Sequence, residues 1–404
     1  MKIIITGASG FVGRLITSEL NKKNIKILLV GRSLKKLKKI YPNNKVCEYN
    51  ELIKFANDYD CLLHLATFNN KKQNDYKKAR SENLNIFKQV YKIAKKYKLY
   101  IFNFSSTHSL DLFCKTNYAE SKREIEKYVE NENYDRIQTL YLPLIYGRIM
   151  SGKLKIMNLL PKPISKLIFY FLSAFKPTIN IDTIMLYILN YDFNSKDANS
   201  KNHQLNILSD NIDKNLFFSF FKRAFDLVFS VFIIIFLWWL FFLIWLLIRL
   251  ETPGPGVIFQ KRVGKNGKIF NCIKFRTMQF GVKQAPTHQM SLNDLTNFGR
   301  VLRKTKLDEF PQIFNIIFNQ MSLIGPRPCL DIQHKLISKR EEFNILKIKP
   351  GITGYAQINK IDMSNTDIIT QFDYVYLKTQ SIILDCKIII KTIFGAGNID
   401  NIQS

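Results

Sequence analysis

Two adjacent carboxylates, Asp308 and Glu309, are the side chains of this sequence best suited to chemistry. They stand on a basic background, downstream of a long apolar run and upstream of Gly325-Pro326-Arg327-Pro328. An isolated Asp-Glu pair is usually solvated surface. A nucleophilic carboxylate beside a metal-binding one, next to a membrane anchor, instead suits phosphoryl transfer from a soluble donor to a lipid phosphate.

Further motifs surround this pair. They are Lys222-Arg223 with Asp226, Phe259 to Gly264, Lys274 to Met278, Met321 to Pro328 and Lys349 to Gly354. With these motifs in this order, residues 222 to about 392 resemble the bacterial sugar transferase family, the monotopic phosphoglycosyl transferases. The resemblance implies that Asp308 attacks the sugar-bearing phosphate of a nucleoside diphosphate sugar, usually a UDP-sugar, and passes the phosphosugar to polyprenyl phosphate. It also implies that Glu309 helps bind Mg²⁺.

Cations have to neutralise the anionic diphosphate during such an attack. Lys274, Arg276 and Arg327 are the candidate phosphate-binding and substrate-binding residues, because guanidinium forks and ammonium groups bind phosphate oxygens. Arg327 lies between two prolines, which limit its backbone freedom. The sequence leaves open the alternative that Arg276 and Arg327 brace the fold.

The chain opens with a second chemical signature. An apolar strand over residues 1–6 leads into Gly7, Gly10 and Gly13, a spacing that permits a tight turn, close approach to a pyrophosphate and packing of a helix on its strand. After the next strand, Arg32 stands where an acidic residue usually binds the ribose of NAD. A cation there fits the 2′-phosphate of NADP(H), with NAD as the alternative.

Tyr118 and Lys122 are spaced to lie one helical turn apart on one face. A lysine near a tyrosine favours the phenolate, which can exchange a proton with a substrate alcohol or ketone. Together with the strand 60–66 and Ser105-Ser106-Thr107, these residues make positions 1 to about 210 similar to the extended short-chain dehydrogenase/reductase family. The resemblance implies catalytic roles for Thr107, Tyr118 and Lys122.

This second match departs from its family in two respects. Thr107 and Tyr118 are unusually close, and the segment after Tyr146-Gly147 is short for a substrate-binding lobe. His108-Ser109 replaces the Asp-Glu of the family's dehydratases, which speaks against a dehydratase. A reductase of a UDP-4-ketosugar, an epimerase and an inactive sugar-nucleotide-binding module remain.

Length and composition predict two α/β domains joined by a membrane element. A chain of 404 residues exceeds the roughly 250 to 300 at which single cores stop growing, and residues 194–200 resemble a linker. We expect a doubly wound, parallel Rossmann-type sheet over residues 1–212, closed by a short strand at 205–208. A membrane helix over 216–250 and a small α/β transferase domain over 251–404 follow. A homodimer is compatible with this organisation.

Ala224 to Ile248 contains one charged residue, Asp226, and as a straight helix would be roughly 37 Å long, enough to cross a hydrocarbon layer of roughly 30 Å. Both domains need cytosolic substrates, and cations flank both ends of the run. We therefore expect a re-entrant helix on the cytoplasmic face of the bacterial inner membrane, with a spanning helix as the alternative. The family's hairpin bends at a proline, where this chain has Trp238-Trp239, so packing or polar contacts must cause the bend.

The net charge of +28 suits membrane lipid better than nucleic acid, because the chain has no aromatic-basic nucleic-acid motif. The basic and apolar segment 153–176 is expected either on the membrane surface or in the core of the first domain. The six cysteines lack zinc or Cys-x-x-Cys spacing and fit reduced cytosolic thiols. His64 and His108 are expected to be structural.

Overall fold

The computed structural model describes residues 1–67, 76–132, 134–147, 157–193, 205–210, 212–282 and 294–395. Contacts between residues divide the chain into two units. The N-terminal unit is Met1–Tyr170 with Pro177–Asp210, and the C-terminal unit is Phe171–Lys176 with Asn211–Ser404. The linker-like residues 194–200 lie outside the described residues.

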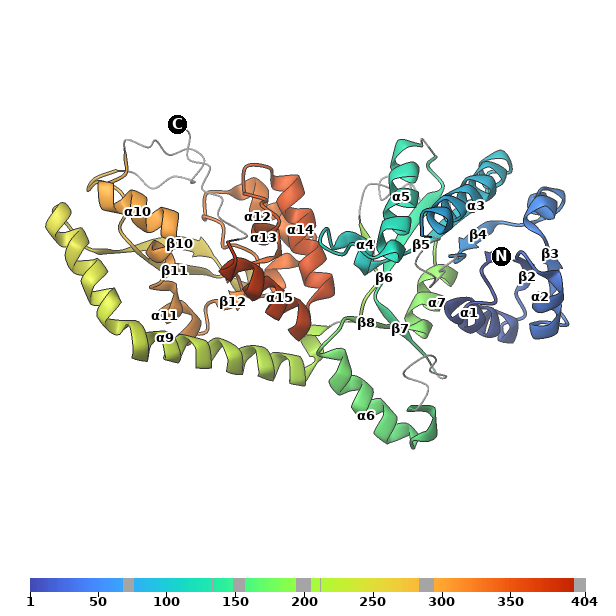
Figure 1. The fold of residues 1–404 in the computed structure, drawn as a ribbon, viewed down its shortest axis with the longest axis horizontal. Coiled ribbons are helices and arrows are strands. Elements are labelled where there is room, and N and C mark those ends of the chain that lie inside the picture. The colour runs from blue at the N-terminus through green and yellow to red at the C-terminus, as the bar shows by residue number, and fades with distance from the viewer. Residues whose placement is uncertain are drawn as a thin grey trace. The chain divides into compact units, whose positions relative to one another are not determined.

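The N-terminal unit contains a seven-stranded parallel sheet of order β3-β2-β1-β4-β5-β6-β9 (Figure 1). The strands are β1 Lys2–Thr6, β2 Lys26–Val30, β3 Lys45–Cys47, β4 Cys61–His64, β5 Tyr100–Ser106, β6 Ile137–Leu142 and β9 Asn206–Ile207. This order is that of doubly wound dinucleotide-binding folds with one strand added, so the predicted fold class is confirmed. The short closing strand expected at 205–208 is β9.

Helices cover both faces of this sheet. Ile3 and Ile5 of β1 share one core with α1 and α7, whereas Ile4 shares the opposite core with α3 and α5. The helices of this unit are α1 Phe11–Lys22, α2 Leu34–Ile40, α3 Tyr76–Lys96, α4 Thr107–Leu110, α5 Asn117–Asn131 and α7 Ile181–Leu189; the 3-10 turns are η1 Tyr49–Lys54 and η2 Ala56–Asp58. The helix α6 Lys162–Ser173 begins in this unit and ends in the C-terminal unit. The strands β7 Leu144–Tyr146 and β8 Thr178–Asn180 form a separate parallel pair.

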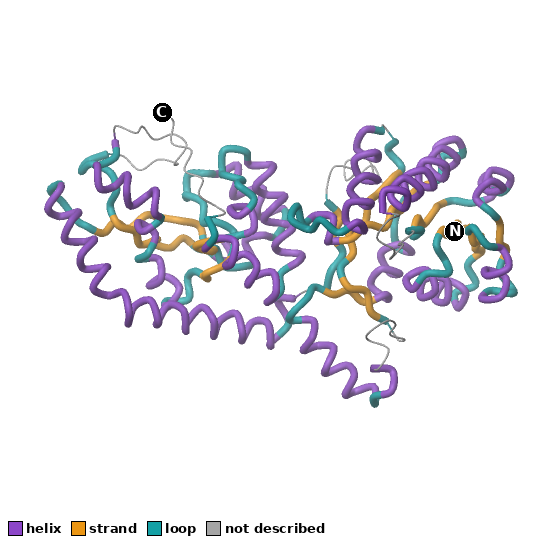
Figure 2. Tube along the Cα trace, viewed as in Figure 1, coloured by secondary structure: helices purple, strands orange, loops and turns teal. Residues whose placement is uncertain are grey.

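The C-terminal unit combines many helices with short strands (Figure 2). Its helices are α9 Leu216–Glu251, α10 Asn297–Thr305, α11 Gln312–Ile317, α12 His334–Glu342, α13 Tyr355–Ile358, α14 Thr366–Thr379 and α15 Ile382–Ile393. Its 3-10 turns are η6 Ile212–Lys214, η7 Lys265–Gly267, η10 Leu307–Glu309 and η11 Ile345–Lys347. The strands β10 Val257–Val263 and β11 Ile269–Phe275 pair antiparallel, and β12 Ser322–Ile324 pairs parallel with β13 Gly351–Thr353.

The apolar helix α9 packs both of its ends against the same unit. Near its start, Arg223 donates to the carbonyls of Ile316 and Ile317 at 2.8 and 3.1 Å. Near its other end, the ring of Phe241 lies 5.9 Å from that of Phe310, and Ile244 is buried in the same core. By length and composition α9 could cross a membrane. However, Phe241 follows Asp226 by 15 residues, a rise of roughly 23 Å, which is less than the roughly 30 Å of the hydrocarbon layer.

Figure 1 shows that α9 bends between its two halves. The Ser230 hydroxyl donates to the Asp226 carbonyl at 2.7 Å, and the Trp239 indole donates to the Phe236 carbonyl at 3.0 Å. Side-chain bonds to helix carbonyls are a known cause of bending without proline. Such polar contacts are the kind of cause expected from the sequence, and the indole belongs to the Trp238-Trp239 pair, where the resemblance implies a proline.

His64 lies in the core of the N-terminal unit at the end of β4. Its side chain is fully buried, its Nδ1 lies 3.1 Å from the Thr6 hydroxyl, and its ring meets that of Phe87 edge-on at 5.0 Å. Burial, followed by the nearby Lys122 charge, lowers the pKa of His64 to about 3. The imidazole is therefore neutral at physiological pH, as a structural histidine should be.

We expect acid to destabilise the N-terminal unit through His64. The folded pKa is about 3 and the unfolded pKa is about 6.5, so the unfolded state binds more protons between these values and stability falls as pH falls. From pH 7 to pH 5 the loss should be about 2 kcal/mol. Pulse proteolysis of the full chain in lipid nanodiscs measures it. His64→Gln should show less acid loss than the exposed control His108→Gln, and equal losses would refute the assignment.

Candidate active sites

Asp308 and Glu309 lie together on η10, between α10 and α11. The turn begins because Lys306 adopts a left-handed backbone conformation, φ 61°, that ends α10. Pro311 then precedes the first residue of α11. Both acidic residues are buried, with 8% and 7% of their surface exposed. Burying a carboxylate is costly unless it is paired, so this turn requires cations around it.

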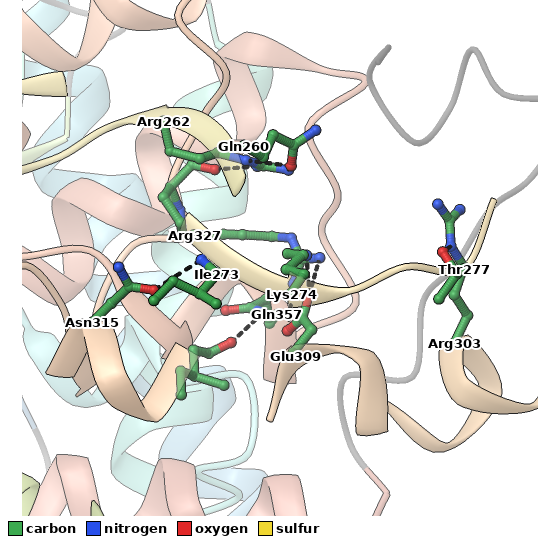
Figure 3. A network of polar contacts seen from close by, with 12 residues as sticks. Gln260, Arg262, Ile273, Lys274, Thr277, Arg303, Glu309, Asn315, Arg327 and Gln357 are labelled. Carbon is green, nitrogen blue, oxygen red and sulfur yellow. Dashed lines mark hydrogen bonds and ion pairs between the residues drawn. The ribbon is translucent and has the colours of Figure 1, made fainter. Parts of the chain in front are cut away.

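Two cations converge on Glu309, as Figure 3 shows. Lys274 of β11 contacts Oε1 at 2.9 Å, and the Arg327 guanidinium donates to Oε1 at 2.6 Å and to Oε2 at 3.5 Å. Burial alone would raise the pKa of the Glu309 carboxyl, but the Arg327 and Lys274 charges outweigh it and hold the pKa well below its usual range. Glu309 is therefore ionised, and the structure brings together two of the three predicted phosphate-binding cations.

Two further arginines hold the backbone of the loop that contains Arg327 and Pro328. Arg262 of β10 donates to the carbonyl of Pro328, and Arg340 of α12 donates to the carbonyl of Arg327 at 2.9 Å. Arg340 is itself paired with Asp373 at 2.7 Å, and both side chains are 2% exposed. Removing one member of such a buried pair strands the other charge. These contacts therefore fix the loop that presents Arg327 to Glu309.

Arg276, the third predicted cation, lies at the turn that follows α9. Its guanidinium donates to the carbonyls of Thr252 and Pro253 at 2.9 and 2.7 Å, and to the Thr252 hydroxyl at 2.7 Å. Gly254 gives it room, because a Cβ there would lie 2.4 Å from Arg276 Nη1. These contacts are those expected if Arg276 braces the fold, which is the alternative that the sequence left open. A phosphate-binding role for Arg276 stays a prediction.

Asp226, the lone acid of the apolar run, connects α9 to the strand that precedes the Arg327 loop. Its Oδ1 accepts from the Leu323 amide at 2.9 Å and from the Ser322 hydroxyl at 3.1 Å. One turn earlier, Lys222 pairs with Asp385 of α15 at 2.6 Å. Sequence reasoning missed the partner Asp385, which lies in a segment without a recognisable motif. A single charge in an apolar run was the available signal for Asp226.

The glycine turn after β1 has the close packing that its spacing predicts. Gly7 has φ +75°, and its carbonyl accepts from the Gly10 amide at 3.0 Å. A Cβ on Gly13, in the first turn of α1, would lie 2.3 Å from the Gly7 carbonyl. Arg32 follows β2 and is exposed. In a sheet of this order, the loops after β1 and β2 lie at one edge, where dinucleotides bind.

Tyr118 and Lys122 lie on α5, as predicted. The Lys122 ammonium is 5.9 Å from the centre of the Tyr118 ring and donates to the Phe104 carbonyl at 2.8 Å. Burial, partly offset by Glu126, lowers the pKa of Lys122 to about 8. Desolvation, followed by the Glu126 charge, raises the pKa of Tyr118 above its usual value. A hydrogen bond with Ser106 lowers this pKa but does not outweigh the other two effects. The phenol is therefore protonated near neutral pH, and the hydroxyl bonded to it belongs to Ser106, one residue before Thr107.

Glu126 is a further residue of this cluster that sequence reasoning missed. It lies one helical turn beyond Lys122, is 9% exposed, and accepts from the Ser109 hydroxyl at 2.7 Å and from the Ser105 hydroxyl. Its spacing from Lys122 on α5 was the available signal. Thr107 is the first residue of α4, next to these serines.

Comparison with known proteins decides the family of the C-terminal unit. The exopolysaccharide production protein ExoY of Sinorhizobium fredii is 36% identical over 190 residues, which cover 43% of this chain and 83% of that protein. The family model for bacterial sugar transferases matches residues 217–397. The chain belongs to the bacterial sugar transferase family. The model for the NAD dependent epimerase/dehydratase family matches residues 3–168, so both predicted resemblances are confirmed.

Other members of the family are longer than the matched segment. A UDP-N-acetylgalactosamine-undecaprenyl-phosphate N-acetylgalactosaminephosphotransferase of Aeromonas hydrophila is 36% identical over 186 residues. The match covers 44% of this chain and 43% of that protein, so the chain spans less than half the length of this relative. Among solved structures, the Bordetella bronchiseptica enzyme WbmG in complex with NAD and UDP aligns at 16% identity with a TM-score of 0.36, covering 46% of this chain and 67% of that one. That overlap adds nothing to the sheet topology described above.

Replacing Asp226 by alanine should lower the free energy of unfolding of the C-terminal unit by about 1–3 kcal/mol, because two buried donors lose their acceptor. Asp226→Asn keeps an acceptor oxygen and should retain most of the stability. The melting temperature of the full chain in lipid nanodiscs compares the two variants. Equal losses for alanine and asparagine would show that the charge, and not the acceptor, holds β12.

Proposed function

We propose that this chain transfers a phosphosugar from a UDP-sugar to polyprenyl (undecaprenyl) phosphate at the membrane, through a covalent intermediate on Asp308. The observation that carries the proposal is the buried pair Asp308-Glu309, with Lys274 and Arg327 bound to Glu309. Membership of the bacterial sugar transferase family supports it, as do relatives named as undecaprenyl-phosphate sugar phosphotransferases.

The reaction divides into two displacements at one phosphorus atom. In the first, an Asp308 oxygen bonds to the sugar-bearing phosphorus, the bond to the bridging oxygen breaks, and UMP leaves with the electron pair. In the second, an oxygen of polyprenyl phosphate attacks the same phosphorus and releases Asp308, which leaves a lipid-linked diphosphate sugar. Lys274 and Arg327 supply positive charge where the phosphate oxygens gather negative charge.

The acidic pair also fits Mg²⁺. This ion is usually held by one or two carboxylates together with substrate phosphates, and no group of three or more His, Cys, Asp or Glu side chains occurs among the described residues. Glu309 Oε1 accepts two short bonds, whereas within the described part of the chain its Oε2 has only the long 3.5 Å contact from Arg327. Glu309 would hold the ion. Bound there, Mg²⁺ would neutralise diphosphate charge.

We further propose that α9 enters and leaves the membrane by the same leaflet, at the cytoplasmic face. The support is that Arg223 and Phe241, on either side of the bend, contact the same unit. A spanning helix would place these two contacts on opposite sides of the bilayer. The exposed part of α9 between them therefore forms the membrane anchor.

For the N-terminal unit we propose an NADPH-dependent reductase of a UDP-4-ketosugar, whose product would be the donor for the transferase. Tyr118 would give its proton to the substrate oxygen, with Lys122 and a hydroxyl of Ser106 or Thr107 beside it. Gly7, Gly10, Gly13 and Arg32 would bind the cofactor. When bound, NADPH supplies the hydride. An epimerase or an inactive sugar-nucleotide-binding module is the alternative.

Asp308→Asn should abolish release of UMP from a UDP-sugar, with at least about a thousandfold loss, because an amide is a poor nucleophile. The assay uses the full chain in nanodiscs with polyprenyl phosphate, and multiple turnovers should require that lipid. The control is Asp367→Asn, an exposed carboxylate on α14 that should leave the rate unchanged. Activity retained in Asp308→Asn would refute the proposed nucleophile.

Tyr118→Phe should lower NADPH oxidation with UDP-4-ketosugars by at least about a hundredfold, because the proton donor is lost. Ser106→Ala should cost more than Thr107→Ala, because Ser106 is bonded to Tyr118. Absorbance of the reduced nicotinamide follows the reaction, and UMP release serves as the internal control that should not change. A larger loss in Thr107→Ala would restore the role that the family resemblance implies, and no oxidation by the unaltered chain would refute the reductase.

A further inference from the structure

The helix α6 exposes apolar side chains on most of its surface. Phe169 is its only buried residue, whereas Leu167 is 62% and Ile164 is 48% exposed. Other large apolar residues that are more than a third exposed on this helix are Ile168, Tyr170, Phe171 and Leu172. Soluble helices normally turn such residues inward, and a large exposed apolar patch marks an interaction surface. The sequence left open whether this segment lies on the membrane surface or in the core of the first domain. The exposure of α6 excludes the domain core for this helix.

Positive charge accompanies this apolar surface. Lys162, Lys166 and Lys176 are exposed along and just beyond the helix, and the sequence has no acidic residue between Tyr146 and Asp182. Lys153 and Lys155 of the same basic segment lie outside the described residues. An apolar helix flanked only by cations matches the boundary between acyl chains and anionic headgroups.

The end of α6 is joined to the start of the membrane helix α9 within the C-terminal unit. The Ser173 hydroxyl accepts from the Asn215 amide group at 2.8 Å, and Asn215 in turn caps α9 by accepting from the Phe218 amide at 3.0 Å. The rings of Phe171 and Phe217 meet edge-on at 5.3 Å. The apolar surface therefore continues from the last turn of α6 onto α9.

We propose that α6 is a second membrane element, which lies in the interface of an anionic bilayer beside the point where α9 enters. The 12 residues of α6 are about 18 Å long, too short to span roughly 30 Å of hydrocarbon, so the helix lies along the surface. Its partner is lipid, because the patch is continuous with the anchor helix and carries only cations. This inference rests on the membrane placement of α9 proposed above.

Photocrosslinking of the full chain tests this placement. The photoreactive residue p-benzoylphenylalanine replaces Leu167 on α6, Phe232 on α9 or Leu186 on α7, all of which are exposed, in nanodiscs of phosphatidylglycerol and phosphatidylethanolamine. After irradiation, mass spectrometry of the labelled peptides measures lipid adducts. The position 167 should give at least about fivefold more adduct than position 186. Lys162→Glu combined with Lys166→Glu should lower the yield at 167 without changing that at 232.

Each other outcome overturns a distinct claim. If position 232 gives lipid adducts but position 167 gives no more than position 186, the role of α6 is refuted and the anchor role of α9 is not. Crosslinks from 167 to protein alone would refute lipid as the partner. Absence of adducts at 232 would overturn the membrane placement of α9 and, with it, this inference.

Discussion

The ion pairing of one buried carboxylate, Glu309, is the constraint on which the C-terminal unit depends. A carboxylate that is 7% exposed cannot stay charged unless cations reach it. Lys274 comes from β11, and Arg327 from the loop after β12. The short hairpin, the 3-10 turn and this loop must therefore meet at one point. The same arrangement that stabilises the charge leaves a positively charged site beside Asp308.

This constraint connects the apolar helix α9 to the loop that presents Arg327. The Asp226 carboxylate accepts from a backbone amide of β12. Arg262 and Arg340 donate to the carbonyls of Pro328 and Arg327 in the loop that follows β12. Three elements distant in sequence thus limit the movement of Arg327. Under the proposed function, the chemistry on a lipid phosphate has to occur at the bilayer surface. If α9 lies in lipid as proposed, its bonds to β12 keep the loop that follows β12 at the depth of the lipid phosphate.

Local patterns in the sequence predicted the parts whose geometry is set by neighbouring residues. The glycine spacing after β1 and the positions of Tyr118 and Lys122 on α5 are of this kind, since a turn or a helix fixes them. Whether Ser106 or Thr107 faces Tyr118 depends on how β5 ends, because successive side chains of a strand point to opposite sides. The contacts of Arg276 with Thr252 and Pro253 depend on how α9 ends against β11. No spacing rule carries that information.

The bend of α9 shows how a long apolar helix can turn without proline. A bend lengthens backbone hydrogen bonds on its outer side, and an unsatisfied carbonyl in hydrocarbon costs several kcal/mol. Proline removes a donor outright, so the freed carbonyl needs another partner. In α9 the Trp239 indole bonds the Phe236 carbonyl from within the helix itself. The side chain thus supplies a donor to a helix carbonyl while every backbone amide is kept, so these contacts can bend a helix without a proline.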